Sequence, residues 1–323
     1  MSQKARAVYD ERGYVMAAQE HQYLMAILLG FAAGVLARFC MLRSDYRNYP
    51  SYPHGYIIHL SLGAIAAVLA SLAVPALIEE ELTAITFLVL CAQQFRDIRS
   101  MERETLMKLE EQALIPRGAD YIEGIAKVFE SRNYLVMLVA LLVSAFVVMI
   151  NWQAGCLAAV VLVGVSIFCM RGSYIGDIAQ IQAGTLHFEK SLLYVDDIVL
   201  MNVGDPSARE KILREGVGIV LKPYNDDGRA VLNSPGQRQA ILHDISILTG
   251  NQMDIGEQEW SPMARKNMKT GVLGIFVLPN YKDTQAVISA AERVPVLESA
   301  AQKPLSNPIG RKLAKQKNSD QIA

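Results

Sequence analysis

Few side chains in this sequence have the types and spacing that enzyme chemistry requires. Asp196 and Asp197 are adjacent acids at the start of a predicted strand, and paired carboxylates can share a proton in an acid–base site. Adjacent strand residues point to opposite faces, so a dyad would need two copies of the chain to meet. No Asp-Thr-Gly or Asp-Ser-Gly turn is present. We therefore interpret the pair as solvated turn acids.

Serine, histidine and aspartate occur close together once, in a predicted helix that follows Ser234. Ser234 precedes Pro235 and has the character of a helix N-cap, whereas His243 lies more than two turns further along, next to Asp244. That separation is too long for the direct hydrogen bond of a nucleophile and its base. Arg238 lies near the N-terminus of the same helix, where a phosphate or an acidic peptide could bind, but no glycine-rich loop accompanies it. We expect structural roles for these residues.

Metal-ligating residues are sparse as well. His54 and His59 are five residues apart, off the spacing of three or four that makes helix neighbours, so they do not predict a joint metal site. His59 is expected to donate to an acceptor on a neighbouring helix. The cysteines lie inside or at the ends of apolar runs, without CxxC spacing, and predict neither disulfides nor metal ligands: Cys40, Cys91, Cys156 and Cys169. We predict no metal and no cofactor, and the catalytic residues, if any, stay unknown.

The segments that carry these side chains divide into an apolar half, before Met170, and a more polar half after it. A bilayer core about 30 Å thick is crossed by about 20 apolar helical residues. Five stretches predict membrane spans: Tyr23 to Leu42, Tyr56 to Ile78, Leu82 to Phe95, Tyr134 to Ile150 and Ala154 to Met170. Spans one to three fall in residues 23–95 and spans four and five in 134–170, after a polar head at 1–22. The third stretch is short, so length alone does not decide whether it crosses.

The distribution of basic residues decides the orientation. Residues 96–132 hold seven Lys and Arg, whereas the turns at 79–81 and 151–153 hold none. Basic residues accumulate on the cytoplasmic side, so this pattern favours five spans with the N-terminus outside and the C-terminus in the cytoplasm. Only the basic residues of the N-terminal head oppose it. Arg38, near the end of the first span, is expected to extend to the lipid headgroups.

Small residues recur on the first span at Ala26, Gly30, Gly34 and Ala37, and on the second at Gly63, Ala67 and Ala70. Such faces let two helix backbones approach closely. Contact within one bundle is favoured over dimerisation.

The connection at 96–133 predicts two amphipathic helices separated by Pro116-Arg117-Gly118. In the second helix, Ile122, Ile125, Ala126 and Phe129 share a face. The helices could lie on the membrane surface, which we favour, or dock on the C-terminal domain.

Residues Tyr121-Ile122-Glu123-Gly124-Ile125-Ala126 spell YIEGIA, and the chain resembles the YIEGIA family of membrane proteins of endospore-forming bacteria. The segments 45–55, 93–97 and 101–104 also resemble that family. The resemblance implies a sporulation gene set, a sporulation or spore membrane, and an association with membrane proteolysis. It assigns no catalytic residue.

The polar half, 171–302, predicts a small cytoplasmic α/β or α+β domain. Predicted strands at 198–203, 217–221 and 272–278 alternate with helices at 205–215, 235–248 and 284–293. Val296, after the last helix, completes this alternation of strands and helices. The basic tail at 303–323 is predicted to be disordered.

These observations favour a membrane-anchored binding or regulatory component of sporulation, with the bilayer and other sporulation or spore membrane proteins as partners. The net charge of −1 and the absence of a basic stripe exclude a nucleic-acid partner. One alternative is a protease that acts on spore membrane proteins, so enzymatic activity is left open. A second is a transporter, against which the lack of carboxylates in the middles of the spans argues.

Overall fold

The computed structural model describes residues 3–45, 49, 53–95, 97–111, 113, 115–170, 172–255 and 257–314. The chain forms two compact units. The helical unit contains Met1–Met101 and Val128–Arg171, and the C-terminal unit contains Glu102–Lys127 and Gly172–Ala323. The predicted loop helices therefore divide between both units, and their central part belongs to the C-terminal one.

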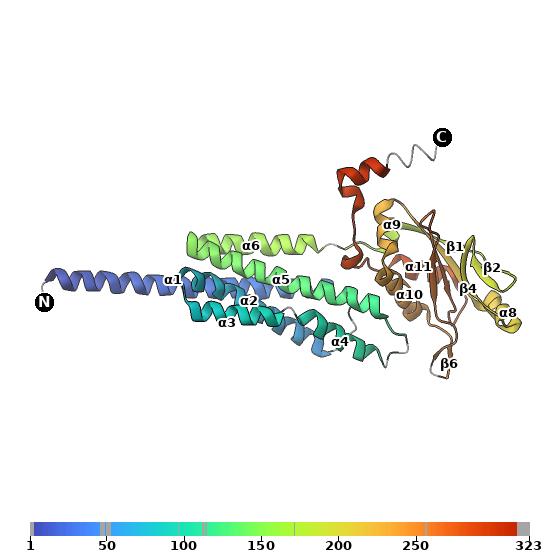
Figure 1. Ribbon diagram of the computed structural model, residues 1–323, viewed down its shortest axis with the longest axis horizontal. Helices are drawn as coiled ribbons and strands as arrows, with labels where there is room; N and C mark the ends of the chain where they lie inside the picture. Colours follow the sequence, from blue (N-terminus) through green and yellow to red (C-terminus); the bar gives the residue numbers. More distant parts are fainter. Residues whose placement is uncertain are drawn as a thin grey trace. The chain divides into compact units, whose positions relative to one another are not determined.

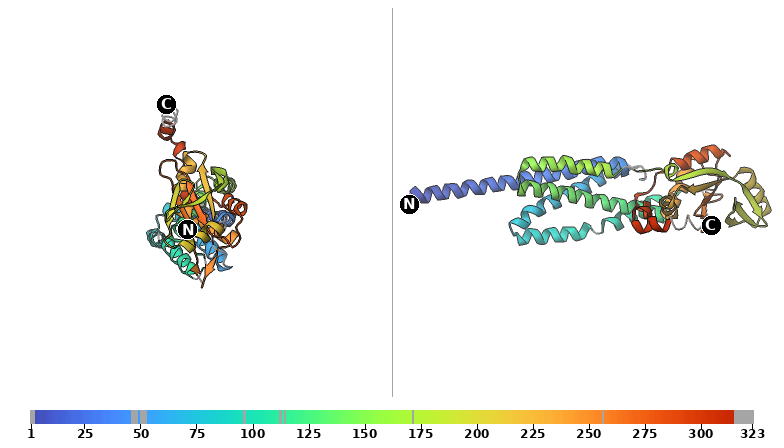
Figure 2. Two further views of the ribbon diagram at one scale, coloured as in Figure 1. Left: turned by 90° about the vertical axis from the view of Figure 1, so that its right-hand side faces the viewer. Right: turned by 90° about the horizontal axis from the view of Figure 1, so that it is seen from above.

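The helical unit is built from long helices that lie side by side (Figures 1 and 2). The first six helices of the chain are α1 (Gln3–Asp45), α2 (Pro53–Ile78), α3 (Leu82–Phe95), α4 (Ile98–Glu110), α5 (Ala119–Met149) and α6 (Trp152–Cys169). Each of the five predicted apolar stretches corresponds to one of these helices. One prediction was wrong in detail, because the second loop helix and the fourth span form one continuous helix, α5. Ser131-Arg132-Asn133 between them contains no glycine or proline that would end a helix.

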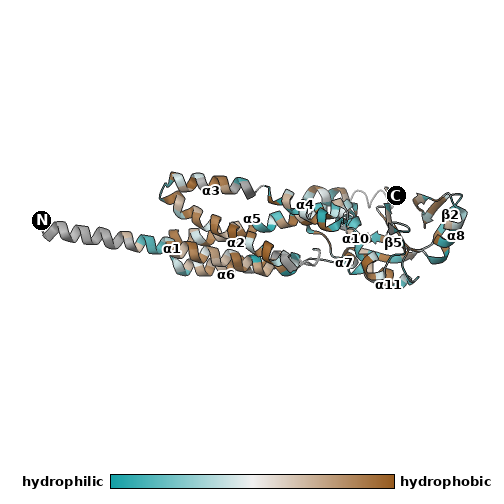
Figure 3. Ribbon diagram, turned by 90° about the horizontal axis from the view of Figure 1, so that it is seen from below, coloured by the Kyte–Doolittle hydropathy of each residue, from teal (hydrophilic) through white to brown (hydrophobic). Residues whose placement is uncertain are grey.

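Three helical segments are long and apolar enough to cross a membrane, namely Ala18–Asp45, Gly55–Ile78 and Ala119–Met149. Two apolar helical segments, Leu82–Cys91 and Trp152–Phe168, are shorter. Hydrophobic residues dominate these helices in Figure 3, whereas the C-terminal unit has many hydrophilic ones. A membrane location is compatible with this pattern.

The small residues of α1 lie against other helices of the same unit, as expected from their spacing. A Cβ atom on Gly30 would lie 2.8 Å from the carbonyl oxygen of Ala140, and one on Gly34 would lie 2.6 Å from the Cβ of Ala67. Gly164 of α6 has open space around it. The glycines of α1 therefore bring α1 close to α2 and α5.

The C-terminal unit contains a four-stranded sheet and a three-stranded sheet (Figure 1). The larger sheet has the order β1 (Ala179–Gly184), β5 (Val217–Pro223), β9 (Leu273–Val277), β8 (Met263–Lys266). The smaller one has the order β2 (Leu186–Glu189), β3 (Leu192–Val195), β4 (Ile198–Asn202), and β6 (Met253–Asp254) pairs with β7 (Glu257–Gln258). All these pairs are antiparallel. Of the two fold classes predicted, the antiparallel pairing matches α+β.

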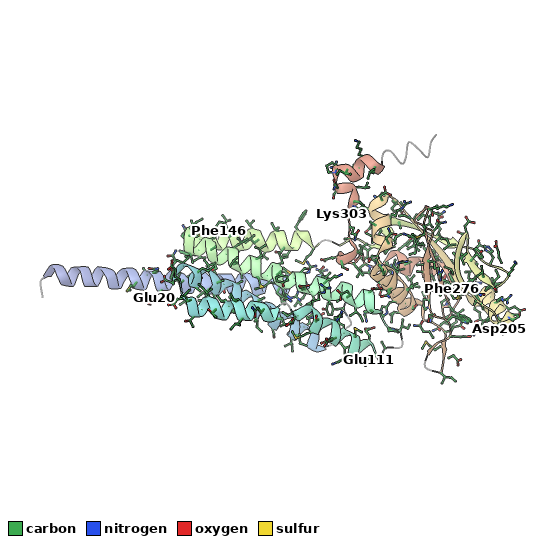
Figure 4. The ribbon with its side chains drawn as sticks, in the orientation of Figure 1. Glu20, Glu111, Phe146, Asp205, Phe276 and Lys303 are labelled. Carbon is green, nitrogen blue, oxygen red and sulfur yellow. The ribbon has the colours of Figure 1, made fainter. Side chains whose placement is uncertain are left out.

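Helices cover one face of the larger sheet and the smaller sheet covers the other. The helices of this unit are α7 (Ile175–Ile178), α8 (Pro206–Glu215), α9 (Asp226–Asn233), α10 (Pro235–Thr249) and α11 (Thr284–Glu292), followed by the 3-10 turns η1 (Glu298–Ala300) and η2 (Pro304–Ser306). α8 contacts β2 of the smaller sheet. α9, α10 and α11 contact the larger sheet, and β3 and β4 contact β5 and β9. Phe276, labelled in Figure 4, lies fully buried between the two sheets with Leu193 and Leu200. α10 packs on the larger sheet of this two-sheet core through β8 and β9.

Local sequence signals set the helix ends correctly in this unit. Asp205 caps α8 and Gly216 ends it, while the Ser234 side chain accepts from the backbone of Gln237 at the start of α10. Gly250 ends α10 with a φ of 71°, a value that favours glycine. At Val296 the predicted strand is absent among the described residues, where only an isolated bridge joins Tyr174 and Pro295.

Candidate functional site

The YIEGIA residues form the first turns of α5 and pack within the C-terminal unit. Tyr121 and Ile125 are buried, and the Tyr121 backbone N–H donates to Oε1 of Gln239 at 3.0 Å. A Cβ on Gly124 would lie 2.8 Å from the hydroxyl of Ser299 in η1. The loop helices were expected either on the membrane surface or docked on the C-terminal domain. For this segment the structure shows docking on the C-terminal domain. The favoured surface placement was wrong here, because the buried face is already filled by protein.

α10 approaches α5 closely because it begins with glycine. A Cβ on Gly236 would lie 2.5 Å from the carbonyl oxygen of Asp120, so any other residue would push the helices apart. The next residue, Gln237, is fully buried and holds η1 in position. Its amide donates to the carbonyl of Pro295 at 3.1 Å, and its oxygen accepts from the N–H of Leu297 at 2.7 Å. The first turn of α10 therefore contacts the start of α5 through Gly236 and the segment before η1 through Gln237.

A partly buried ion pair holds the segment before the motif. Nη1 of Arg117 donates to Oε1 of Glu110 at 2.6 Å, and the Arg117 N–H donates to Oε2 of Glu110 at 2.8 Å. The guanidinium lies 5.9 Å from the centre of the Tyr121 ring. The end of α4 is thereby tied to the start of α5, and Ala113 and residues 115–118 form a wall opposite α10.

A pocket of about 610 Å³ lies between this wall and α10. Its lining residues come from three segments: Ala113, Ile115, Pro116, Arg117 and Gly118; Gln239, Leu242, His243 and Ser246; and Gln258, Ser261 and Pro262. Nε of Arg117, Nδ1 of His243 and Oγ of Ser246 are buried and have no hydrogen-bond partner among the described residues. Each of these atoms exposes less than 1 Å², so they belong to the packed wall of the pocket and do not face its open space.

Burial changes the pKa values of two neighbouring groups on α10. It lowers the pKa of His243 to about 4, with the positive charge of Arg117 acting in the same direction and Glu110 against it. It raises the pKa of Asp244 to about 6, and Arg117 opposes that rise. His243, whose ring lies 6.0 Å from that of Tyr121, is therefore neutral at pH 7.

A second group of buried polar residues lies inside the helical unit. Nη1 of Arg38 contacts Oδ2 of Asp45 at 2.5 Å, and Nε of Arg132 contacts Oδ1 of Asp45 at 3.2 Å. The Arg38 Nε also donates to the carbonyl of His59 at 3.3 Å, and its guanidinium lies 5.5 Å from the ring centre of Phe129. The predicted extension of Arg38 to the headgroups was wrong, because the side chain is fully buried and paired within the bundle. Removing one partner of such a buried pair typically costs about 3–5 kcal/mol, so the cluster has a structural role.

The predicted polar candidates lie in separate places. Asp196 and Asp197 form the exposed turn between β3 and β4, and Oδ1 of Asp196 accepts from the Thr185 N–H at 2.8 Å. Ser234 is the α10 cap, and Arg238 is half-buried on α10. The ring of His59 packs against Tyr49 and Phe129, each 4.6 Å away, and the side chain of His54 lies outside the described residues.

Of these candidates only His243 lines the pocket. Sequence reasoning missed Arg117, which was interpreted as part of a helix break, and also Gln239 and Ser246. A signal for the latter two exists, because residues 239, 243 and 246 follow the spacing of one helix face. Within the described chain no group of three or more His, Cys, Asp or Glu side chains gathers as a metal site would require.

The fold and the pocket define a class of protein in which long apolar helices compatible with a membrane are joined to an α+β domain. The chain belongs to the YIEGIA protein family, whose model matches residues 26–307. It is 43% identical over 282 residues to the uncharacterized protein YphB of Bacillus subtilis (strain 168), which covers 87% of this chain and 95% of the relative. No solved structure matches.

The two shifted pKa values predict opposite pH dependences of stability. Between pH 4 and 6.5 the unfolded chain protonates His243 before the folded chain does, so this group destabilises the domain as pH falls. Between pH 3.9 and 6 the folded chain holds a proton on Asp244 that the unfolded chain lacks, so this group stabilises the domain as pH falls. We expect the stability of Asp244→Asn to decrease on acidification and that of His243→Phe to increase, each by at most about 1.4 kcal/mol per pH unit.

Hydrogen exchange of the β5 and β9 amides in the full chain measures how the stability of each variant changes with pH. The exposed Asp197→Asn is the control. Slopes of the same sign in the two variants would contradict the assignment.

Proposed function

We propose that this chain is an integral membrane protein that acts in sporulation by binding a partner polypeptide in the pocket that Ala113, residues 115–118 and α10 line. The observation that carries the proposal is a pocket of about 610 Å³ that combines apolar lining, such as Leu242 and Pro262, with the polar side chains of Gln239 and Ser261. The family resemblance and a relative from a sporulating bacterium support the biological setting. The partners are inferred to be other sporulation or spore membrane proteins.

The alternative of a membrane protease finds no support in the pair closest to its chemistry. His243 and Ser246 are one turn apart on α10, but Nδ1 of the one and Oγ of the other are both without hydrogen-bond partners in the described chain. A serine nucleophile needs a direct hydrogen bond to its base. The pair therefore lacks the hydrogen bond that a nucleophile and its base would share.

We also propose that α1, α2, α3, α5 and α6 cross the membrane, with the N-terminus outside and the C-terminal unit in the cytoplasm. The 14 residues of α3 span about 21 Å and the 18 of α6 about 27 Å, near or below the thickness of a bilayer core. The basic residues between 96 and 132, against none in the turns at 79–81 and 151–153, support this orientation.

The orientation predicts that a tag after Ala323 stays unlabelled by a membrane-impermeant reagent in intact cells and becomes labelled when the cells are opened. A cysteine at Glu80, in the turn before α3, should react from outside. Labelling of the C-terminal tag in intact cells would overturn the orientation.

Filling the pocket should prevent partner binding. A photo-reactive amino acid at Ser261, on the pocket rim, is expected to crosslink to a partner during sporulation. Leu242→Trp occupies the pocket and should abolish that crosslink and reduce the yield of heat-resistant spores. Leu213→Trp, on the exposed side of α8, is the matched control and should change neither.

An unchanged crosslink and spore yield in Leu242→Trp would contradict the proposal. A partner that accumulates only in His243→Phe or Ser246→Ala cells would instead support the protease.

A further inference from the structure

We infer that two copies of this chain pair through β1, in antiparallel orientation, so that their larger sheets join into one continuous sheet. The inference concerns the outer edge of that sheet and does not depend on the pocket or on its proposed partner. It follows from the backbone groups that β1 leaves open, from the absence of protection along that edge, and from the way the open segment complements itself.

The outward-facing backbone groups of β1 follow from its pairing with β5. β1, labelled in Figure 1, is an outer strand of the larger sheet. One residue before the start of β1, the Tyr224 N–H donates to the Ile178 carbonyl at 3.0 Å, in the same register as the strands. Because hydrogen-bonded and non-hydrogen-bonded pairs alternate along an antiparallel ladder, the even-numbered residues of β1 bond to β5. Ala179, Ile181 and Ala183 therefore direct their N–H and C=O groups to the open side.

The chain itself limits the open segment at both ends. At the start, the Ala179 N–H donates to the Ile175 carbonyl of α7. At the end, the Thr185 N–H donates to Oδ1 of Asp196 at 2.8 Å, and the Asp196 N–H donates to the Thr185 carbonyl at 3.0 Å. Both contacts agree with the alternation, since residues 179 and 185 are odd-numbered. Within the described part of the chain, the groups that stay open are the C=O of Ala179 and the N–H and C=O of both Ile181 and Ala183.

This edge lacks the features with which proteins usually keep an outer strand from pairing. Such strands carry charges or prolines, are very short, contain a bulge, or lie under another element. β1 has the sequence Ala-Gln-Ile-Gln-Ala-Gly, without charge or proline, and no bulge interrupts its register with β5. At the other edge of the same sheet, β8 is shorter, carries Arg265 and Lys266, and contacts β4. The contrast indicates that a strand covers the β1 edge.

A second copy of β1 matches the open groups. With a two-fold axis at Ile181, the two Ile181 residues exchange both of their hydrogen bonds, and each Ala183 N–H donates to the Ala179 carbonyl of the other copy. Moving the axis by one residue would put Ala179 opposite Thr185, where Asp196 already binds. The open segments of the two copies therefore coincide in a single register.

The side chains are compatible with the same register. Gln180 lies opposite Gln182 of the other copy, and no charged residues of β1 meet across the axis. Nζ of Lys222 donates to Oε1 of Gln182 at 3.0 Å, which leaves the amide nitrogen of Gln182 to donate to Gln180 of the other copy. Ala179 and Ala183 on the opposite face are small, so they leave room beside the buried Ile181.

Cysteine crosslinking tests the register in membranes that contain the full chain with its own four cysteines replaced. Two differently tagged chains are co-expressed, one with Gln180→Cys and the other with Gln182→Cys. These positions form a non-hydrogen-bonded pair with Cα atoms about 4.5 Å apart, within the range of a disulfide. We expect mild oxidation to join the two tags. Either variant expressed alone places its cysteines on a diagonal, about 7–8 Å apart, and should remain largely uncrosslinked. No joined product, equal crosslinking in the single variants, or a crosslink to a different protein would overturn the inference.

A second experiment changes one outward N–H and leaves the β1–β5 ladder intact. Ala183→Pro removes a hydrogen bond from each half of the two-fold pair, whereas Ala183→Ser keeps the N–H and is the matched control. Native mass spectrometry of the full chain in detergent, over a series of concentrations, should show a dimer that dissociates roughly ten-fold or more readily in Ala183→Pro and as the unchanged chain does in Ala183→Ser. Unchanged hydrogen exchange of the β5 and β9 amides establishes that the proline variant is folded. A monomeric unchanged chain, or an equally stable dimer in a folded Ala183→Pro chain, would contradict the pairing.

Discussion

The close packing of the start of α5 against α10 and η1 is the constraint on which the C-terminal unit depends. Gly236 lets the two helices meet at a distance that no side chain would allow, and Gln239 accepts the Tyr121 N–H that α5 itself cannot pair. Gly124 leaves room for Ser299. With these contacts in place, Glu110 and Arg117 hold Ala113 and residues 115–118 opposite α10, and the pocket lies between them. The YIEGIA residues thus anchor the start of α5 beside the pocket and are not among the residues that line it.

The helical unit is held by a different balance of forces. Where hydrophobic residues face both lipid and neighbouring helices, close approach and polar contacts supply specificity. Small residues at Gly30 and Gly34 supply the first, and the buried cluster of Arg38, Asp45 and Arg132 supplies the second. A charged cluster of this kind is expensive to bury and costly to disrupt, which favours one arrangement of the helices over others.

Much of the fold could be predicted because its signals are local. Caps at Asp205 and Ser234, the prolines after them and Gly250 fix helix ends within a few residues of sequence. Strand pairing is not local, so the sequence left α/β and α+β open, and β1 passed unnoticed because Gln180 and Gln182 weaken its apolar pattern.

The candidate site was harder to predict for the same reason. Arg38 has the sequence context of an interfacial residue, and only the fold brings Asp45 and Arg132 to it. Likewise, Arg117 and His243 are 126 residues apart, and no local pattern links a helix break to a distant helix face. His243 was a candidate for catalysis with Ser234, whereas the structure pairs it in space with Ser246 and Arg117 around a pocket.

The most direct test of the motif's role is a disulfide between Gly124→Cys and Ser299→Cys in a chain whose own four cysteines are replaced. The Cβ atoms would lie 3.9 Å apart, within the range of about 3.5–4.5 Å that a disulfide requires. Mild oxidation of membranes should remove both free thiols and produce a mobility shift that reductant reverses. The control pair of Gly124→Cys with Ser207→Cys should keep its thiols. Free thiols in the first pair under conditions in which folded chain is recovered would contradict the docking of the motif on η1 and α10.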